Sequence, residues 1–351
     1  MSQRNLEHLV TDNFRLCCPN VKPSKTSMNC HAPFDEISSC KDILSNIFIR
    51  SFLWIVAVLT IIGNIGVIIF RVFLDNDVKT SFRIVITCLS VSDFIMGIYL
   101  IIIGSADVAY RDRYILMEDQ WKNSVYCQIA GFLCLLSSET SALFILLVTL
   151  DRLMAICFPF RKHLHFNGCS ATVACIIVWL IGLTMAVVPI LPPFEHWRLY
   201  SQKSIGVPLP ITRIRFPGYD YAFSIFILFN IVVFFLVAVG QALIYVSIRL
   251  QEVPKEWRRH IRHDTAIAKR LTLVVLTDCL CWFPITVMGL AARAGKPVPG
   301  EMYVVATVFL LPINSAFNPF LYTLHAMMLA RQARRKKRPR QKPITSSQGS
   351  S

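Results

Sequence analysis

Three acidic side chains stand inside long apolar stretches of this sequence: Asp93, Glu139 and Asp278. A charge at the centre of a bilayer costs about 2.5–3.5 kcal/mol or more, so each carboxylate should face other helices and find hydrogen-bond donors. Glu139 is interpreted as a satisfied core acid. We expect no enzyme, because the chain shows no metal-ligand spacing, nucleophile elbow or phosphate-binding glycine loop.

Asp93 lies about midway along the second apolar stretch and has four candidate partners in other stretches: Asn64, Ser141, Asn314 and Asn318. Asn314 and Asn318 are four residues apart and therefore share a helix face. These oxygen atoms predict a pocket for Na⁺, or a carboxyl that takes up a proton on activation. A purely structural hydrogen-bond network is the alternative, and no other cofactor is expected.

Prolines interrupt two of the later apolar stretches. Pro284 removes a hydrogen bond from its helix and kinks it, which makes a natural hinge. Asp278 lies four residues before Trp282 and is placed to latch this hinge to Asn318. The predicted activation switch comprises Asp278, Trp282, Pro284, Asn318, Pro319 and Tyr322. The alternative is that these are ordinary prolines of membrane helices, where proline is common.

Asp151 and Arg152 end the third apolar stretch, and Asp264 precedes the sixth. If these two helices pack together, Arg152 can pair with both acids. A pair of this kind holds the mouth of the bundle closed and frees Arg152 when it breaks, which is a two-state element. An ordinary interfacial arginine is the alternative.

The elements that must carry these residues are membrane helices. The chain has 351 residues, of which 54% are hydrophobic and only 16% charged. Each apolar stretch reaches the ~20 residues that a helix needs to cross a bilayer. The seven stretches are Ser51–Phe70, Ile84–Ala106, Asn123–Leu150, Gly168–Pro193, Tyr221–Ile248, Leu271–Ala292 and Met302–Leu324. We therefore expect an all-α membrane protein, a seven-transmembrane helix bundle.

The placement of charge orients this bundle. The formal net charge is +15, eight basic residues crowd into Arg331–Lys342, and no acid follows Glu301. The positive-inside rule then predicts a multi-pass protein with its C-terminus in the cytosol and its N-terminus outside. The basic cluster near the C-terminus is expected to face anionic membrane lipid. No aromatic residue lies within Ala330–Lys342, so binding to nucleic acid is not expected. The predicted segments are an extracellular hinge at 1–48, the bundle at 49–324, an amphipathic helix at 325–337 and a disordered tail at 338–351.

Four cysteines precede the first apolar stretch, on the extracellular side where disulfides persist. They are Cys17, Cys18, Cys30 and Cys40. Adjacent cysteines pair only with strain, so we expect Cys17 and Cys18 each to bond to one of Cys30 and Cys40. A zinc site formed by all four is the alternative.

Several motifs occur in order, one in each expected helix. They are Gly63-Asn64, Asp93 after Leu89-Ser90-Val91-Ser92, Asp151-Arg152, Trp179, Cys281-Trp282-Phe283-Pro284 and Asn318-Pro319-Phe320-Leu321-Tyr322. Over about residues 45–335 the chain resembles the rhodopsin-like G-protein-coupled receptors. Thr277-Asp278-Cys279-Leu280-Cys281 and Leu311-Pro312-Ile313-Asn314 resemble the leucine-rich-repeat hormone receptors, and relaxin receptors in particular.

The resemblance implies a plasma-membrane receptor that passes a relaxin-like or glycoprotein-type hormone signal to a heterotrimeric G protein. Coupling to a Gs-type protein, which raises cyclic AMP, is typical of this branch. It implies a G-protein cleft lined by Asp151, Arg152, Asp264, Lys269 and Arg270. It also implies that Phe34–Ser45 is an internal activating segment.

Three departures from that family pattern are visible. Only Asn5–Leu9 hints at a leucine-rich repeat, so hormone capture is expected only with an upstream ectodomain. Cys127 has no cysteine to pair with in Leu191–Tyr221 and is expected to be free or bonded to the N-terminal segment. Gln241 stands where relatives have a tyrosine that faces the arginine of the third helix.

These departures, with no secretory signal over Met1–Arg15, support one alternative: a shortened, non-signalling form that dimerises with full-length receptors. Homo- or hetero-dimerisation is left open in either case.

Overall fold

The computed structural model describes residues 8–10, 18, 29–31, 40–74, 80–159, 161, 163, 165–207, 209–211, 215–250, 258–296, 298, 302–303 and 305–321. Of residues 8–10, 29–31 and 258–271 it describes the backbone only. The helix predicted at 325–337, the tail at 338–351, Cys17 and Tyr322 lie outside the described residues.

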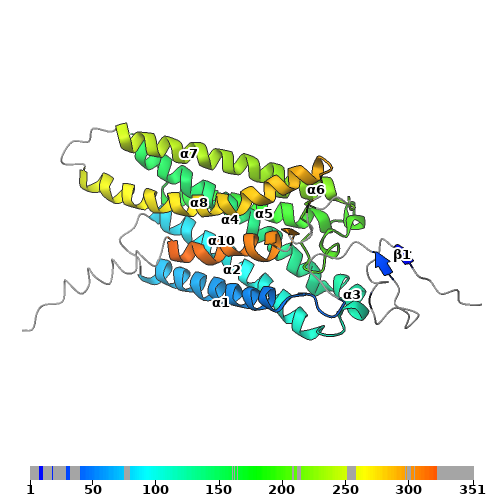
Figure 1. Ribbon diagram of the computed structural model, residues 1–351. Helices are drawn as coiled ribbons and strands as arrows, with labels where there is room; N and C mark the ends of the chain where they lie inside the picture. The colour runs from blue at the N-terminus through cyan, green and yellow to red at the C-terminus, as the bar shows by residue number, and fades with distance from the viewer. Residues whose placement is uncertain are drawn as a thin grey trace, which may run out of the picture.

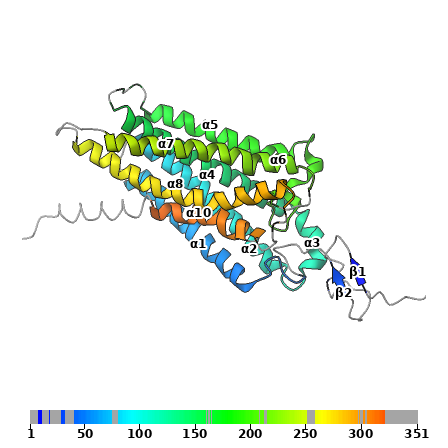
Figure 2. The same ribbon diagram turned by 45° about the horizontal axis from the view of Figure 1, so that its top comes forward.

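Long helices run side by side through the molecule in both views (Figures 1 and 2). In chain order they are α1 (Ile47–Ile69), α2 (Thr80–Ala109), α4 (Val125–Cys157), α5 (Gly168–Val187), α7 (Asn230–Leu250) and α8 (Arg258–Arg293), followed by the shorter α10 (Leu311–Pro319). The short helix α3 (Tyr114–Lys122) lies between α2 and α4, and α6 (Tyr219–Phe223) runs through a π-helical turn into α7 as one span, Tyr219–Leu250.

Among the described residues, six helical segments are long and apolar enough to cross a membrane. They are Ile47–Leu74, Thr80–Ala109, Val125–Cys157, Gly168–Ile190, Tyr219–Leu250 and Thr272–Arg293. The last predicted span corresponds to a shorter apolar helix, Val305–Pro319, beside the described end of the chain at residue 321. The predicted helix bundle is confirmed.

The bundle has two distinct ends. The segment Cys40–Asn46 and α3 lie at one end, which we call the hinge end (Figure 1). Because α4 starts at the hinge end and Arg152 lies in its last turns, we call the opposite end the Arg152 end.

Helix α4 forms the centre of the bundle and packs against α2, α5, α7 and α8. Of its apolar window 78% is buried, against 33% for the window of α1 and 28% for that of α5. The exposed faces carry large apolar side chains such as Phe48, Phe235 and Leu280. Such faces suit a helix whose outer surface meets lipid rather than water.

Three helices contain π-helical turns: Phe70–Leu74, Ser224–Phe229 and Val305–Leu310. A π-turn leaves backbone carbonyls poorly satisfied. In the second case Asn230 compensates, because its Nδ2 lies 3.2 Å from the carbonyl oxygen of Ile225 and 3.4 Å from that of Phe226. The side chain of Asn230 thus stabilises this widened turn, although the span contains no proline.

Two three-residue strands, β1 (His8–Val10) and β2 (Asn29–His31), pair in parallel ahead of the helices. The all-α prediction missed this pair, since three residues are too few to show an apolar alternation. Cys18 and Cys40 form a disulfide with their Cα atoms 5.5 Å apart, a pairing that the sequence allowed. Ile115 of α3 packs against this disulfide, so the cross-linked segment rests on the hinge end.

The close packing of α5 against α4 depends on Gly182. A Cβ atom there would lie 2.2 Å from Cγ2 of Thr140, whereas a Cβ at the exposed Gly66 would meet nothing within 4 Å. We predict that Gly182→Ala lowers the stability of the purified protein by about 1–3 kcal/mol, as overpacking does. Gly66→Ala should leave the unfolding temperature in detergent unchanged or slightly raised. Equal unfolding temperatures for the two variants would contradict this packing.

Candidate functional site

Asp93 joins three helices in the middle of the bundle. Its side chain is fully buried, and Oδ1 accepts hydrogen bonds from Ser141 of α4 at 3.0 Å and Ser315 of α10 at 2.9 Å. Oδ2 accepts one from Nδ2 of Asn318 at 2.8 Å. The structure thus brings together three of the residues predicted for this pocket. Sequence reasoning missed Ser315, although it lies three residues before Asn318 and shares that helix face.

Two predicted partners of Asp93 bind elsewhere. Nδ2 of Asn64 donates to the carbonyl oxygens of Thr60 and Ser315, at 2.9 and 3.0 Å. Asn314 donates to Oδ1 of Asp278. Asn64 therefore binds backbone carbonyls, and Asn314 binds a second buried acid.

Four buried oxygen atoms of these side chains have no hydrogen-bond donor among the described residues. They are Oδ1 of Asn64, Asn314 and Asn318, and Oδ2 of Asp278. Carboxylate, amide and hydroxyl oxygens are the ligands that hard cations prefer. The residues present around Asp93 therefore fit a Na⁺ ion.

Asp278 is almost completely buried in α8, and its partner is Asn314 rather than the predicted Asn318. The predicted partner is wrong by one helical turn of α10. The rotation of α8 against α10 is set by packing, and residue spacing within one helix does not reveal it. Trp282, one turn further on, is 5% exposed, with its ring centroid 6.1 Å from that of Phe234 in α7. Pro284 lies inside α8 and Pro319 is the last residue of α10.

Glu139, on α4, is also a fully buried acid. Oε2 accepts a hydrogen bond from Nδ2 of Asn230 at 3.0 Å, and Oε1 accepts one from Ser138 at 3.4 Å. This geometry agrees with its interpretation as a satisfied core acid.

At the Arg152 end, Arg152 is 1% exposed and lies against its neighbour in sequence. Its Nε donates to Oδ2 of Asp151 at 2.9 Å, and a terminal nitrogen bonds to the same oxygen. Oγ of Ser81 donates to Oδ1 of Asp151 at 3.3 Å and ties the pair to α2. The arginine is thereby held inside the bundle.

Helix α4 packs against α8, which is the condition for a pair between Arg152 and Asp264. The structure does not describe the side chains of Asp264, Lys269 and Arg270. The pair between Arg152 and Asp264 therefore stays a prediction. Gln241 of α7 bridges the same two helices: its Nε2 lies 3.3 Å from Oγ1 of Thr149, and its Oε1 accepts from Thr272 at 3.1 Å.

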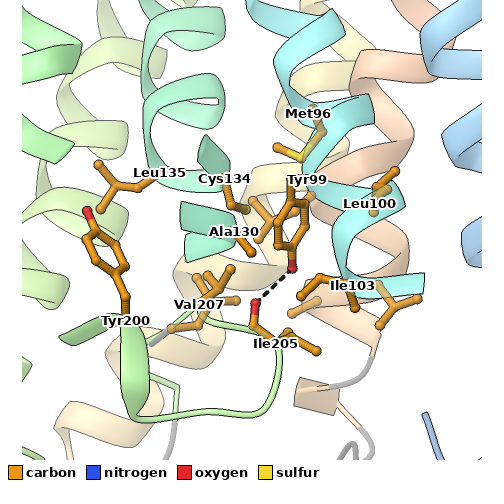
Figure 3. Packing of buried hydrophobic residues seen from close by; sticks show 14 of the residues in the cluster. Met96, Tyr99, Leu100, Ile103, Ala130, Cys134, Leu135, Tyr200, Ile205 and Val207 are labelled. Carbon is orange, nitrogen blue, oxygen red and sulfur yellow. Dashed lines mark hydrogen bonds between the residues drawn. The ribbon is translucent and has the colours of Figure 1, made fainter. Parts of the chain in front are cut away.

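The loop between α5 and α6 fills the hinge end of the bundle. We call its described residues within 199–211 the plug loop. Figure 3 shows Ile205 and Val207 of this loop among side chains of α2 and α4 such as Tyr99 and Cys134. Its buried apolar residues are Leu199, Tyr200, Ile205, Val207, Leu209 and Ile211, each at most 3% exposed.

Side chains on the helices hold the plug loop by its backbone carbonyls. Hydroxyl groups donate from Tyr99 to Ile205 at 3.3 Å and from Tyr303 to Val207 at 2.5 Å. Nε1 of Trp121 in α3 donates to the carbonyl of Ser204 at 2.6 Å. Such contacts cannot be found from sequence, because every residue offers a carbonyl.

Tyr200 anchors the other side of the loop. Burial raises the pKa of its phenol well above the ordinary value, so the group stays protonated and donates to the carbonyl of Ala186 at 2.7 Å. Cys127 forms no disulfide, and its thiol donates to the carbonyl of Tyr200 at 3.5 Å. Of the two predicted states of Cys127, the free thiol is the one observed.

The chain also crosses α4 closely at Gly206, whose φ is +72° and whose Cβ would lie 2.8 Å from the carbonyl oxygen of Cys127. Only glycine fits this conformation and this approach without strain. A backbone contact therefore fixes the plug loop beside Cys127, which forms no disulfide.

A buried charge cluster fixes the hinge segment to the bundle. Asp107 of α2 is fully buried, and its Oδ1 accepts from the backbone N–H of Leu44 at 2.8 Å. Its Oδ2 accepts from Nε of Arg50 at 2.5 Å, and Arg50 also lies 3.3 Å from Asp42. Sequence reasoning missed this cluster, because Asp107 and Arg50 border apolar stretches and resemble ordinary boundary charges.

Comparison with known proteins places this geometry in a family. Residues 63–322 match the 7 transmembrane receptor (rhodopsin family). The chain is 37% identical over 332 residues to G-protein coupled receptor GRL101 of Lymnaea stagnalis, across 92% of this chain and 28% of that protein. It is 32% identical over 324 residues to relaxin receptor 2 of Canis lupus familiaris, across 91% and 43%.

The follicle-stimulating hormone receptor of Cairina moschata is more distant, at 28% identity over 298 residues, covering 84% of this chain and 41% of that receptor. The chain thus spans less than half the length of each of these relatives. Their names confirm the predicted similarity to relaxin and other hormone receptors. With most of its length matched, the chain belongs to the rhodopsin family of seven-transmembrane receptors.

Proposed function

We propose that this chain is the transmembrane part of a receptor that passes a relaxin-like or glycoprotein-type hormone signal to a Gs-type heterotrimeric G protein and raises cyclic AMP. The hinge end would face the outside of the cell and the Arg152 end the cytosol. The observation that carries the proposal is the buried Asp151–Arg152 pair on α4, a helix that also packs against α8.

The signal would enter through the hinge segment. Asp107 holds Leu44, and the disulfide of Cys18 and Cys40 packs on Ile115 of α3. The same short helix carries Trp121, which holds the plug loop. Movement of the hinge would therefore be felt by the plug loop through rigid, packed contacts.

The plug loop is bonded to Tyr99 of α2 and to Tyr303 at the start of the last span, so its movement would bias both helices. Their middle parts meet at Asp93. Bending of α8 at Pro284 would then move its Arg152-end half away from α4 and release Arg152. The freed arginine, with Lys269 and Arg270, would line the G-protein cleft.

Na⁺ would be held by Asp93, Ser141, Ser315 and Asn318, with Asn314 beside them. When bound, the ion supplies positive charge to a buried carboxylate that otherwise depends on hydroxyl and amide donors. These side chains tie α2, α4 and α10 together, so an ion bound to them would favour the packed, closed arrangement.

We predict opposite effects for the two members of the proposed Arg152–Asp264 pair. In cells expressing each variant at matched surface levels, Asp264→Ala should raise basal cyclic AMP several-fold, because Arg152 loses a restraint. Arg152→Ala should abolish the basal signal. Glu195→Ala, at an exposed acid in the loop between α5 and α6, is the matched control and should behave like the parent chain.

Flat signals in all variants despite normal surface expression would contradict the proposed Gs coupling and favour the silent-partner alternative. Co-expression with a full-length relative would then test that alternative, which predicts a reduced response from the relative.

The sodium proposal predicts a salt-specific stability. The purified chain should unfold at a higher temperature in NaCl than in KCl of equal ionic strength, because an ion that binds only the folded state stabilises it. Asp93→Asn should remove this difference. Glu139→Gln, another buried acid replaced by its amide, should keep it. A difference that persists in Asp93→Asn would place the ion elsewhere.

Docking of the hinge predicts an effect of Asp107→Asn on hydrogen exchange. The amide offers one acceptor oxygen where two donors, Leu44 N–H and Arg50 Nε, converge. Backbone exchange over residues 41–50 should therefore become faster, as local opening costs less free energy. Glu195→Gln, at an exposed acid in the loop between α5 and α6, should leave it unchanged. Unaltered exchange in Asp107→Asn would mean that the cluster does not hold the hinge.

A further inference from the structure

We propose that Phe82 is a positioning residue that keeps Arg152 in its closed position by a cation–π contact. The inference rests on the proposed function and deepens it, because it names a second restraint on the arginine beside Asp151. Cζ of Arg152 lies 4.7 Å from the centroid of the Phe82 ring. That distance is well inside the ~6 Å within which a guanidinium is attracted by a ring face.

The surroundings strengthen this contact. Phe82 is 3% exposed and Arg152 1% exposed, so water does not compete for the arginine on this side. Cation–π attraction grows when both groups are desolvated. The guanidinium is thus held by Asp151 through hydrogen bonds and by Phe82 through its ring face.

Both restraints depend on the start of α2. Ser81 donates to Asp151, and the next residue, Phe82, supplies the ring. The start of α2 therefore orients the anion and the cation of the pair together. Release of Arg152 toward a G protein requires loss of both contacts, and the ring contact is independent of any pair with Asp264.

A neighbouring ring provides the comparison. Arg71, in the π-helical turn that ends the first span, has its Cζ 5.6 Å from the centroid of Phe82 and 5.6 Å from that of Phe70. Phe70 is also buried, at 9% exposure. Phe70→Leu therefore removes a buried ring beside a cation without touching the contact to Arg152, and it matches Phe82→Leu in lost volume.

The first arm of the test measures basal signalling at matched surface expression. Phe82→Leu should raise it by about three- to tenfold, since even a modest restraint on Arg152 shifts a two-state equilibrium by that factor. Phe82→Tyr keeps the ring face and should restore the low signal, and Phe70→Leu should not reproduce the rise. Equal effects of the Phe82→Leu and Phe70→Leu changes would overturn the proposal, because ordinary core packing would explain both.

The second arm needs no G protein. Thermal unfolding of the purified chain is measured for Phe82→Leu, Arg152→Met and the double variant, and the same cycle is repeated with Phe70→Leu. The Phe82 cycle should be non-additive and the Phe70 cycle additive. If every variant is silent in cells, the proposed Gs coupling is wrong, and the unfolding cycle alone tests the contact between Phe82 and Arg152. Additivity in the Phe82 cycle would overturn the proposal.

Discussion

A carboxylate buried in an apolar bundle has to be matched by hydrogen-bond donors or a cation, and the middle of this molecule is arranged around that constraint. Asp93 draws donors from α4 and α10 while standing on α2, so one side chain fixes three helices against each other. Asp278 does the same for α8 and α10 through Asn314. The two acids share α10, and any movement of α8 is therefore opposed at the centre of the bundle.

The two ends of the bundle solve the same problem differently. At the hinge end the buried charge of Asp107 is matched by Arg50 and a backbone N–H, and the plug loop is bonded through its carbonyls to tyrosine and tryptophan side chains. These are many modest bonds in place of the disulfide that Cys127 does not make. At the Arg152 end the charges are matched within one pair, Asp151 and Arg152, supported by α2. A single pair is more easily broken than many bonds, which agrees with the proposed opening of this end.

The sequence predicts the spans well, because continuous apolar runs of membrane length leave few alternatives. It predicts most of the Asp93 pocket, since hydroxyl and amide side chains in neighbouring spans are few. It misses Ser315, which attracts less notice than the two asparagines around it. It also gives Asp278 the wrong partner, because spacing along one helix does not fix the rotation of another.

Contacts to backbone lie beyond sequence reasoning for a general reason. The plug loop is recognised through the carbonyls of Ser204, Ile205 and Val207, and nothing in their side chains signals it. The clusters at Asp107 and Asp151 depend on residues at the borders of apolar runs. Charges there are expected for any membrane helix, so their burial becomes visible only once the helices are assembled.

In the proposed mechanism the Arg152 end opens by displacement of α8 from α4. Spin labels on Cys157 of α4 and on a cysteine placed at the exposed Leu273 of α8 would report this distance in lipid bilayers, with the other accessible thiols, Cys88, Cys169 and Cys279, replaced. The account predicts that nucleotide-free Gs lengthens the distance distribution, and that Arg152→Ala prevents the change. An unaltered distribution with Gs bound to the parent chain would contradict it.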